Sequence, residues 1–217
     1  MTHPWEVTPA EARAIQTELA RQVERQDRFA GPDYVAGVDV GFEDQGQTTR
    51  AAVVLLTYPE LVPVAERLVR RPTTFSYVPG LLSFREIPAV LEALQLLPRQ
   101  ADIILCDGQG VAHPRRLGIA SHLGVLLDQP TIGVAKTRLT GRYTRTPTAR
   151  GEWVPLTEGA ETLGAVLCTR AAVKPVFVST GHRVALASAI DIVLICAPRY
   201  RLPETTRRAD RLASRRK

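Results

Sequence analysis

Cysteine is scarce in this 217-residue sequence, and the three cysteines stand far apart, each within an apolar run. An odd number of cysteines without C-x-x-C spacing argues against both a disulfide framework and a zinc site. Each is therefore expected to be a small buried hydrophobic residue in a reducing compartment, which predicts a cytoplasmic protein. The three positions are Cys106, Cys168 and Cys196.

Long apolar segments are missing as well. No apolar run approaches the roughly 18 residues that a membrane-spanning helix needs. The segment from Met1 to Glu6 lacks the basic and apolar regions of a secretory signal. No membrane partner is therefore expected.

Three common site motifs are incomplete. The glycine pair at 108 and 110 is followed by His113, where a dinucleotide-binding fingerprint needs a third glycine. Val134 to Thr137 ends like a phosphate-binding loop but lacks the upstream G-x-x-x-x-G-K pattern. Ser179 lies near a histidine, but no nucleophile-elbow sequence surrounds it. These gaps remove the sequence support for a dinucleotide-binding enzyme, a P-loop enzyme or a serine hydrolase.

The charge of the chain is concentrated at one end. The formal net charge is +6, and residues 201–217 hold seven basic and two acidic residues, or +5, which leaves about +1 for the rest. A basic C-terminal tail is suited to weak contact with a phosphate backbone, and a solvated chain end is an equally good interpretation. The hydrophobic content of 45% and charged content of 23% are otherwise globular values, so residues 1–217 are expected to form one domain.

The first part of the chain predicts a helix and an antiparallel meander. Thr8-Pro9-Ala10-Glu11 combines a capping threonine, a proline at the first helical position and a glutamate at the third. The apolar stripe of this helix continues to about Asp27. Two runs rich in valine and leucine, 34–42 and 51–57, flank a polar turn and predict a hairpin, with 61–69 as a third strand.

The second part alternates between helix and strand patterns. The ranges 89–97 and 117–127 have helical patterns, whereas 102–107 and 131–135 are strand-like, and this alternation implies parallel pairing. The remaining elements are apolar runs at 163–168 and 175–179, a helix from about 184 to 196, and a helix that Pro203 opens through the basic tail. The predicted fold class is α/β, with an antiparallel meander that leads into parallel βα units.

Two aspartates stand in or directly after strand patterns, where aspartate is disfavoured. Asp39 alternates with Val38 and Val40, so its side chain is expected on the opposite face from theirs. Asp107 follows the apolar run 103–106, at the end of a strand where α/β sheets usually bind ligands. The alternative roles are structural: a turn or a paired charge for Asp39, and an Asp-Gly turn for Asp107.

A third acid, Glu86, has a competing interpretation. Ser83-Phe84-Arg85-Glu86 matches a capping box, in which the glutamate only satisfies a backbone donor. Pro88 argues against this interpretation, because a helix capped at Ser83 would need the missing N–H of Pro88. The helix is therefore expected to start near Ile87, with Glu86 at its mouth.

Carboxylates from separate sheet elements are suited to Mg²⁺, which prefers hard oxygen ligands and keeps positions for water and substrate phosphate. One ion, or two roughly 4 Å apart, can activate a water and stabilise the leaving 3′ oxygen of an in-line displacement. Asp39, Glu86 and Asp107, with basic residues nearby, therefore favour a metal-dependent enzyme that acts on phosphodiesters.

Several long segments resemble the endonuclease V family, in the family's order from about Val35 to Asp210. The similar segments are Thr74 to Glu86, Asp107 to Gly124, Pro130 to Lys136, Ser179 to Arg183 and Tyr200 to Arg207. The resemblance implies a ribonuclease H-like fold, a mixed sheet with helices on both faces. It also implies a Mg²⁺-dependent endonuclease, with Mn²⁺ as a substitute, for DNA that contains deaminated bases, chiefly inosine. Such enzymes nick the second phosphodiester bond 3′ to the lesion and leave 3′-hydroxyl and 5′-phosphate ends.

The matching positions imply roles for individual residues. Asp39, Glu86 and Asp107 match the metal-binding acids, and His182 matches a histidine beside the metal site. Lys136 and His113 match basic residues near the substrate strand and the base pocket, and Lys136 and His182 are the further catalytic candidates. The substrate-binding candidates are the wedge residues Tyr77, Val78 and Pro79 and the base-pocket residues Gly80, Leu82 and Gly108.

Two positions depart from the family pattern. Ser76 stands where a proline often precedes the wedge tyrosine, and Gln109 stands where a histidine is common. A more flexible loop and altered contacts near the site are expected, while all three metal acids are present. Two alternatives stay open: the same chemistry on inosine-containing RNA, and a lesion-binding protein without catalysis. The sequence predicts no particular protein partner.

Overall fold

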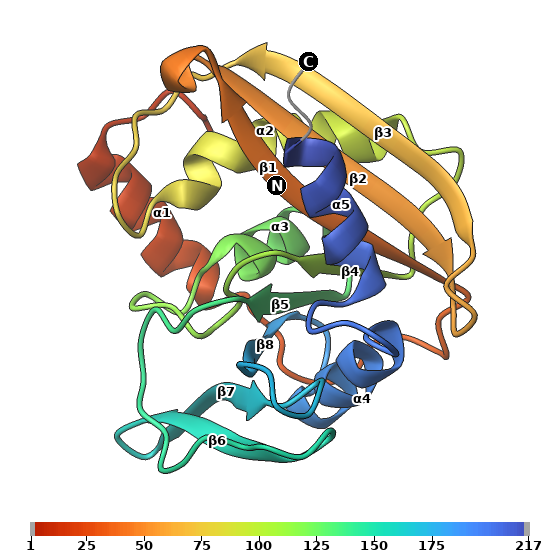
Figure 1. Ribbon diagram of the computed structural model, residues 1–217. Coiled ribbons are helices and arrows are strands. Elements are labelled where there is room, and N and C mark those ends of the chain that lie inside the picture. Colours follow the sequence, from red (N-terminus) through yellow and green to blue (C-terminus); the bar gives the residue numbers. More distant parts are fainter. Residues whose placement is uncertain (1–2, 215–217) are drawn as a thin grey trace.

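The computed structural model describes residues 3–214, which form an eight-stranded sheet and five α-helices (Figure 1). The strands are β1 (Tyr34–Glu43), β2 (Thr48–Thr57), β3 (Pro63–Pro72), β4 (Ile103–Cys106), β5 (Thr131–Ala135), β6 (Trp153–Glu158), β7 (Glu161–Leu167) and β8 (Val176–His182). The helices are α1 (Pro9–Ala20), α2 (Leu82–Gln95), α3 (Ile119–Leu127), α4 (Leu186–Cys196) and α5 (Glu204–Ser214), and a 3₁₀ turn, η1 (Asp44–Gly46), joins β1 to β2. Within the described range, no helix is both long and apolar enough to cross a membrane.

The sheet is mixed, with the strand order β3-β2-β1-β4-β5-β8-β7-β6. The meander of β1, β2 and β3 is antiparallel, and β1, β4 and β5 are parallel neighbours. Both features confirm the predicted α/β class. The strands β8, β7 and β6 then extend the sheet in antiparallel order. The sequence patterns did not predict β6, which contains Pro155, a residue that an edge strand tolerates.

Helices cover both faces of the sheet, as predicted. Alternate residues of a strand point to opposite faces, and each face has its own apolar core. On one face, Val35 and Leu105 pack in a cluster with residues of α4 and α5. On the other face, Val38 and Ile104 pack with residues of α2 and α3. Figure 1 shows α5 lying across β1 and β2 on the side opposite α2.

Two glycines of β1 allow α5 to approach the sheet closely. A Cβ atom at Gly37 would lie 2.2 Å from the backbone carbon of Thr205, and one at Gly41 would lie 2.7 Å from the carbonyl oxygen of Ala213. The buried Arg50 of β2 donates a hydrogen bond to that same Ala213 carbonyl. Contacts at both ends of α5 therefore fix its position over β1.

The start of α2 corrects the sequence prediction. The helix begins at Leu82 rather than near Ile87, so Glu86 lies inside it and Pro88 is an interior residue. Neither capping box nor other side-chain cap is present. Pro88 has no N–H to donate to the carbonyl of Phe84, so local hydrogen bonding disfavours this first turn. The side chains of Leu81 and Phe84 are fully buried, and their packing stabilises the turn instead.

The end of α1 also differs from the prediction, since the helix stops at Ala20 and not near Asp27. The segment that follows is bound to the turn between β8 and α4. The Glu24 amide donates to His182 Nδ1 at 3.2 Å, and Asp27 accepts hydrogen bonds from the Ala185 amide and the Ser188 hydroxyl. These tertiary contacts replace the helical hydrogen bonds that the apolar stripe predicted.

Candidate active site

Asp39 and Asp107 lie side by side because β1 and β4 are parallel and in register. Val38 pairs with Cys106 across the two strands, and the Asp107 amide donates to the Val38 carbonyl at 3.2 Å. Asp39 points to the face that α5 covers, opposite Val38, and Asp210 reaches the same place from α5. One carboxylate oxygen from each of the three aspartates lies within 4.8 Å of the others. We call Asp39, Asp107 and Asp210 the acid cluster.

Glu86 lies close to this cluster but is not one of the three. It comes from α2, on the other face of the sheet, and is 8% exposed. Burial, followed by the charges of Asp39 and Asp107, holds the pKa of Glu86 well above its ordinary value. The electrostatic effect of both aspartates indicates that Glu86 borders the acid cluster.

The acid cluster has the electrostatics of a cation site. Burial, and then the neighbouring charge of Asp107, raises the pKa of Asp39 to about 7 against the opposing effect of Lys136. Burial also raises the pKa of Asp107. Desolvated carboxylates with only oxygen atoms to offer fit a hard divalent cation, because it supplies the positive charge that they lack.

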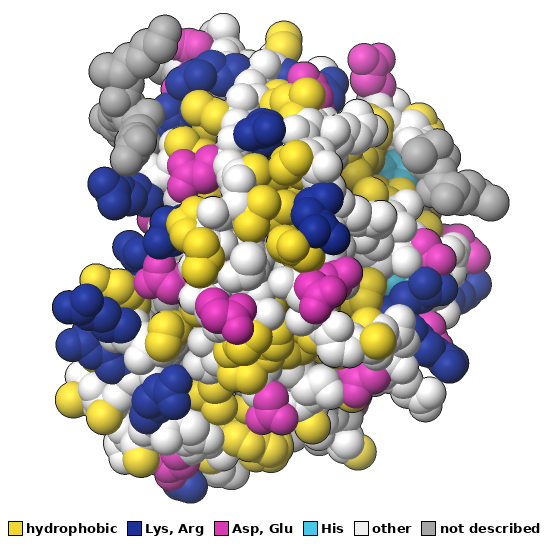
Figure 2. All heavy atoms as spheres, turned by 90° about the vertical axis from the view of Figure 1, so that its right-hand side faces the viewer, with side chains coloured by type: hydrophobic (Ala, Val, Ile, Leu, Met, Phe, Trp, Pro, Cys, Tyr) yellow, Lys and Arg dark blue, Asp and Glu magenta, His cyan; other side chains and the backbone are white. Residues whose placement is uncertain are grey.

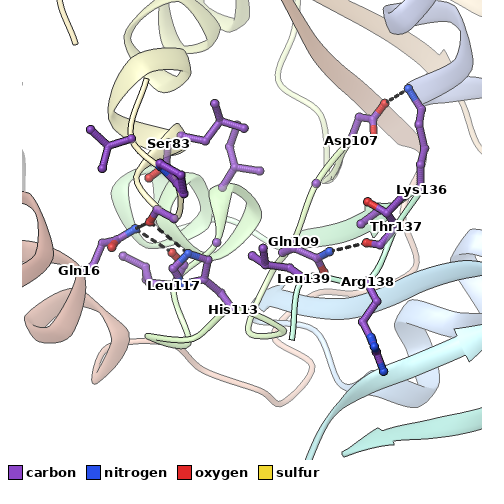
Figure 3. Close-up of a pocket in the computed structure, with 18 of the residues that line it drawn as sticks. Gln16, Ser83, Asp107, Gln109, His113, Leu117, Lys136, Thr137, Arg138 and Leu139 are labelled. Atoms are coloured by element: carbon purple, nitrogen blue, oxygen red, sulfur yellow. Dashed lines mark hydrogen bonds and ion pairs between the residues drawn. The ribbon is translucent and has the colours of Figure 1, made fainter. Parts of the chain in front are cut away.

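Lys136, the residue after β5, already supplies one positive charge. Its Nζ lies 2.6 Å from Asp107 Oδ2 and 2.8 Å from Asp210 Oδ1, and Figure 3 shows the contact with Asp107. Burial lowers the pKa of Lys136, but the hydrogen bonds to the two aspartates outweigh it and raise the pKa above its ordinary value. Lys136 therefore stays protonated beside the acids.

A cavity of about 380 Å³ opens next to the acid cluster, with Asp107 and Lys136 at one end of it (Figure 3). Its lining brings together every wedge and base-pocket candidate that the sequence suggested. These residues are Tyr77, Val78, Pro79, Gly80, Leu82, Gly108 and His113. Tyr77 is 68% exposed at the surface, whereas His113 is buried.

The Gly80 turn forms one wall of the cavity and requires glycine. Its φ of +77° lies in the left-handed region, and a Cβ atom there would lie 2.8 Å from the guanidinium of Arg115. The Gly80 carbonyl accepts hydrogen bonds from His113 Nε2 at 3.1 Å and Arg115 Nη2 at 2.6 Å. Burial, and then the charge of Arg115, lowers the pKa of His113 to about 4, so the ring is neutral and its Nε2–H donates.

Gln109, at the position where the resemblance leads to a histidine, bridges two loops. It is 9% exposed, and its Nε2 donates to the Thr137 carbonyl at 2.9 Å (Figure 3). This bond joins the loop after β4 to the loop after β5, and both loops line the cavity. At position 109, the link between the two loops is therefore a hydrogen bond from a side-chain amide to a backbone carbonyl.

The structure does not bring His182 to the acid cluster, which corrects the position expected for it. His182 pairs with Thr131 at the start of β5, whereas Lys136 follows the end of that strand. At about 3.3 Å per residue, the two positions are about 16 Å apart along the strand. His182 Nδ1 instead accepts from the Glu24 amide, and its Nε2 faces Asp128 at 3.6 Å. Its contacts are those of a structural residue.

The sequence interpretation missed Asp210, although a signal for it was present. Asp210 is an isolated acid among the arginines of the C-terminal helix, next to Arg211 and two residues after Arg208. The sequence places it in a tail that is expected to be solvated or to contact phosphate. Only the packing of α5 on β1 reveals that this one side chain turns inward.

Known proteins of similar sequence and structure agree with this architecture. The Endonuclease V family model matches residues 17–211. The Endonuclease V of Trichormus variabilis is 60% identical over 215 residues, 99% of this chain and 97% of that protein. The crystal structure of the Endonuclease V from Streptomyces avermitilis has a TM-score of 0.92 at 49% identity, covering 98% of this chain and 94% of that one.

A more distant structure was determined with nucleic acid. The Ciona intestinalis Endonuclease V, in complex with a 24mer DNA containing an inosine followed by a ribo-adenosine, has a TM-score of 0.82 at 30% identity. The similarity covers 94% of this chain and 95% of that one. The chain therefore belongs to the endonuclease V family of nucleases.

Proposed function

We propose that this protein is a divalent-metal-dependent endonuclease that recognises a deaminated base in DNA, chiefly hypoxanthine, and nicks the second phosphodiester bond 3′ to it. The products would carry 3′-hydroxyl and 5′-phosphate ends. The observation that carries the proposal is the position of Asp107, which belongs both to the acid cluster and to the lining of the adjacent cavity. A base held in the cavity would keep its own strand next to the acids.

The acid cluster would hold the metal, with Glu86 as the fourth acid. The carboxylate oxygens of these four acids are the hard ligands that Mg²⁺ or Mn²⁺ prefers. A cation bound there would activate a water and stabilise the leaving 3′ oxygen. Lys136, protonated and in contact with Asp107 and Asp210, would pair with a non-bridging phosphate oxygen of the substrate strand.

The wedge and the cavity would recognise the lesion. Extrusion of a base from the stack costs a few kcal/mol, and less when the base is mispaired. The exposed ring of Tyr77 is suited to fill the gap that the extruded base leaves. The Ciona relative was crystallised with inosine-containing DNA, which supports the same class of ligand here.

A nicking assay tests the proposal. An end-labelled duplex with one inosine is incubated with Mg²⁺, Mn²⁺ or EDTA, next to a matched duplex without inosine. The expected result is one product that ends one nucleotide beyond the inosine, formed with either metal and absent in EDTA. Cleavage in EDTA, or equal cleavage of both duplexes, would contradict the proposal.

An RNA strand of the same sequence with one inosine identifies the preferred polymer. Faster cleavage of this strand than of the single DNA strand would favour RNA as the main substrate. If neither polymer is cut while inosine-containing DNA is bound tightly, the protein is a lesion-binding protein without catalysis.

A further inference from the structure

Gln16 of α1 reaches from the first helix into the wall of the cavity. Its side chain is 1% exposed, and it lies outside the segments that carry the family resemblance. Its Nε2 donates to the Gly80 carbonyl at 3.0 Å and to the Leu117 carbonyl at 3.2 Å, while its Oε1 accepts from Arg115 Nε at 2.5 Å. Gln16 thus ties α1 to two other segments at the cavity, the Gly80 turn and the loop 115–117 (Figure 3).

The Gly80 carbonyl receives a third donor through this contact. Gln16, His113 and Arg115 all place a nitrogen within 3.1 Å of the same oxygen. A carbonyl oxygen has two lone pairs, so these donors leave it no capacity for a ligand. The carbonyl therefore fixes the Gly80 turn, and a base in the cavity has to be read by other groups.

The chemistry of the contacts requires an amide at position 16. One end of the side chain donates to two carbonyls while the other end accepts from a guanidinium, and a primary amide offers both functions. A glutamate at this position would keep the pairing with Arg115 but could no longer donate to the Gly80 and Leu117 carbonyls. A methionine keeps most of the volume and loses every hydrogen bond.

The packing of α1 explains how Gln16 is held in place. Ala12, one turn earlier, is buried in a cluster with Phe75, Leu81 and Phe84. Phe75 precedes the wedge residues and Leu81 follows Gly80, so α1 contacts the wedge loop at both of its ends. The capping box formed by Thr8 and Glu11 fixes the start of the helix.

We propose that Gln16 is a positioning residue for lesion recognition, which holds the Gly80 turn and the Leu117 backbone in the geometry that admits the flipped-out base. This inference rests on the proposed function. It assigns part of the base selectivity to the N-terminal helix, which supplies no acid to the cluster.

The experiment compares the full-length protein with Gln16→Glu, Gln16→Met and the control Gln22→Glu, which alters an exposed glutamine just after α1. Steady-state kinetics on an inosine-containing duplex give kcat and KM, and competition by the same duplex without inosine gives an inhibition constant. Both Gln16 variants should raise KM at least about tenfold, with kcat and the inhibition constant within threefold of wild type. Gln22→Glu should match wild type.

Three outcomes would overturn the inference: a wild-type KM in both Gln16 variants, an equal loss of affinity for the inosine and undamaged duplexes, or a similar defect in the control. Gln16→Met retains the apolar volume, so it decides the question if the buried charge of Gln16→Glu prevents folding. If the wild-type protein itself does not discriminate inosine, the proposed function fails, and that result is separate from any effect of Gln16.

Discussion

At the residue scale, Asp210 gives an otherwise basic helix a second role. Arg207 and Arg208 pair with Glu204 on the outside of α5, while Asp210 turns toward Asp39 and Asp107 and contacts Lys136 at 2.8 Å. The helix therefore carries positive charge on its outer side and contributes one carboxylate to the acid cluster.

We predict that Asp210→Asn lowers the single-turnover nicking rate at least about 100-fold, because the amide keeps the shape but removes a charge next to the proposed metal. Binding of inosine-containing DNA in EDTA should change by less than about threefold. The rate should be measured across a Mg²⁺ titration, with the exposed Asp191→Asn of α4 as the control. A wild-type rate at low Mg²⁺ would remove Asp210 from the metal site.

His122 makes stability depend on pH. The side chain is fully buried, its Nδ1 lies 2.9 Å from Ser83 Oγ and its Nε2 lies 2.7 Å from His3 Nε2. Burial, and then the charge of His3, lowers the pKa of His122 to about 3. An unfolded histidine has a pKa of about 6.5, so the unfolded chain binds a proton that the folded protein does not.

The contribution of His122 to the free energy of unfolding is therefore fully present above about pH 6.5, and it is lost as the pH decreases toward about 3. We predict that His122→Gln is less stable than wild type at pH 7 and that this deficit shrinks by about 2.5 kcal/mol at pH 4.5. Urea unfolding at both pH values measures the difference. A deficit that is the same at both pH values would mean that His122 in the folded protein takes up its proton over the same pH range as in the unfolded chain.

Only part of the candidate site can be predicted at the residue scale. Asp39 and Asp107 stand in strand patterns, and parallel pairing predicts that they meet. Asp210 and Gln16 come from helices far away in the sequence, so their approach depends on tertiary packing that no local pattern encodes. His182 illustrates the opposite case, since a matching motif did not specify the end of the sheet at which the side chain lies.

At the element scale, the contact between α5 and β1 couples stability to the site. Gly37 touches the backbone of Thr205, and the same helix carries Asp210. We predict that Gly37→Ala destabilises the protein by about 2–3 kcal/mol, because the methyl group has no space and α5 must move. The nicking rate at a temperature where the variant is folded should also fall, since Asp210 moves with the helix.

Gly31→Ala is the matched control, because a Cβ atom at that position meets nothing within 4 Å. Urea unfolding and the nicking assay should both leave this control near wild type. Retention of full activity by a destabilised Gly37→Ala protein would separate the helix contact from the acid cluster.

The wedge loop can be tested as an element of its own. Among residues 3–214, Tyr77 is the most exposed large hydrophobic residue, and it lies between Phe75 and Gly80. We predict that Tyr77→Ala lowers cleavage of inosine in a duplex about tenfold more than in a single strand, where no partner strand must be parted. Parallel rates on the two substrates measure the ratio, and equal losses would argue against a wedge.

The elements were predicted well where a strong apolar pattern decided them. The meander, β4, α3 and β5 follow such patterns, and burial confirms them. The start of α2 and the end of α1 were wrong because tertiary contacts decided them, through the packing of Phe84 and the binding of Glu24 to His182. The edge strand β6 was missed because Pro155 weakens its local signal.

At the scale of the whole molecule, much of the arginine charge is locally balanced. Arg116 pairs with Glu158 and Glu161, and Arg70 pairs with Glu43. Figure 2 shows basic, acidic and apolar side chains interspersed over one face of the molecule. This face, with its mixed charges, is expected to attract the phosphate backbone only weakly.

The predicted basic tail can be tested without disturbing the fold. Residues 215–217 lie outside the described residues, whereas Ala213 is buried and its carbonyl accepts from Arg50. A chain that ends at Ser214 therefore keeps α5. We predict that it binds undamaged DNA more weakly and that the slope of log affinity against log salt falls by about 1 to 2. An unchanged slope would mean that the tail does not contact phosphate.

The acids of the cluster are far apart in the sequence, and this separation has a consequence for the synthesis of the protein. Asp39 is made early, and Asp210 follows 171 residues later, after every strand of the sheet. Chains fold from the N-terminus as the ribosome produces them, so the meander can form long before α5 exists. A nascent or prematurely terminated chain would thus have a sheet without a complete set of acids. On the proposed function, in which Asp210 helps to hold the metal, the nuclease would become active only once α5 has been translated and has packed on β1.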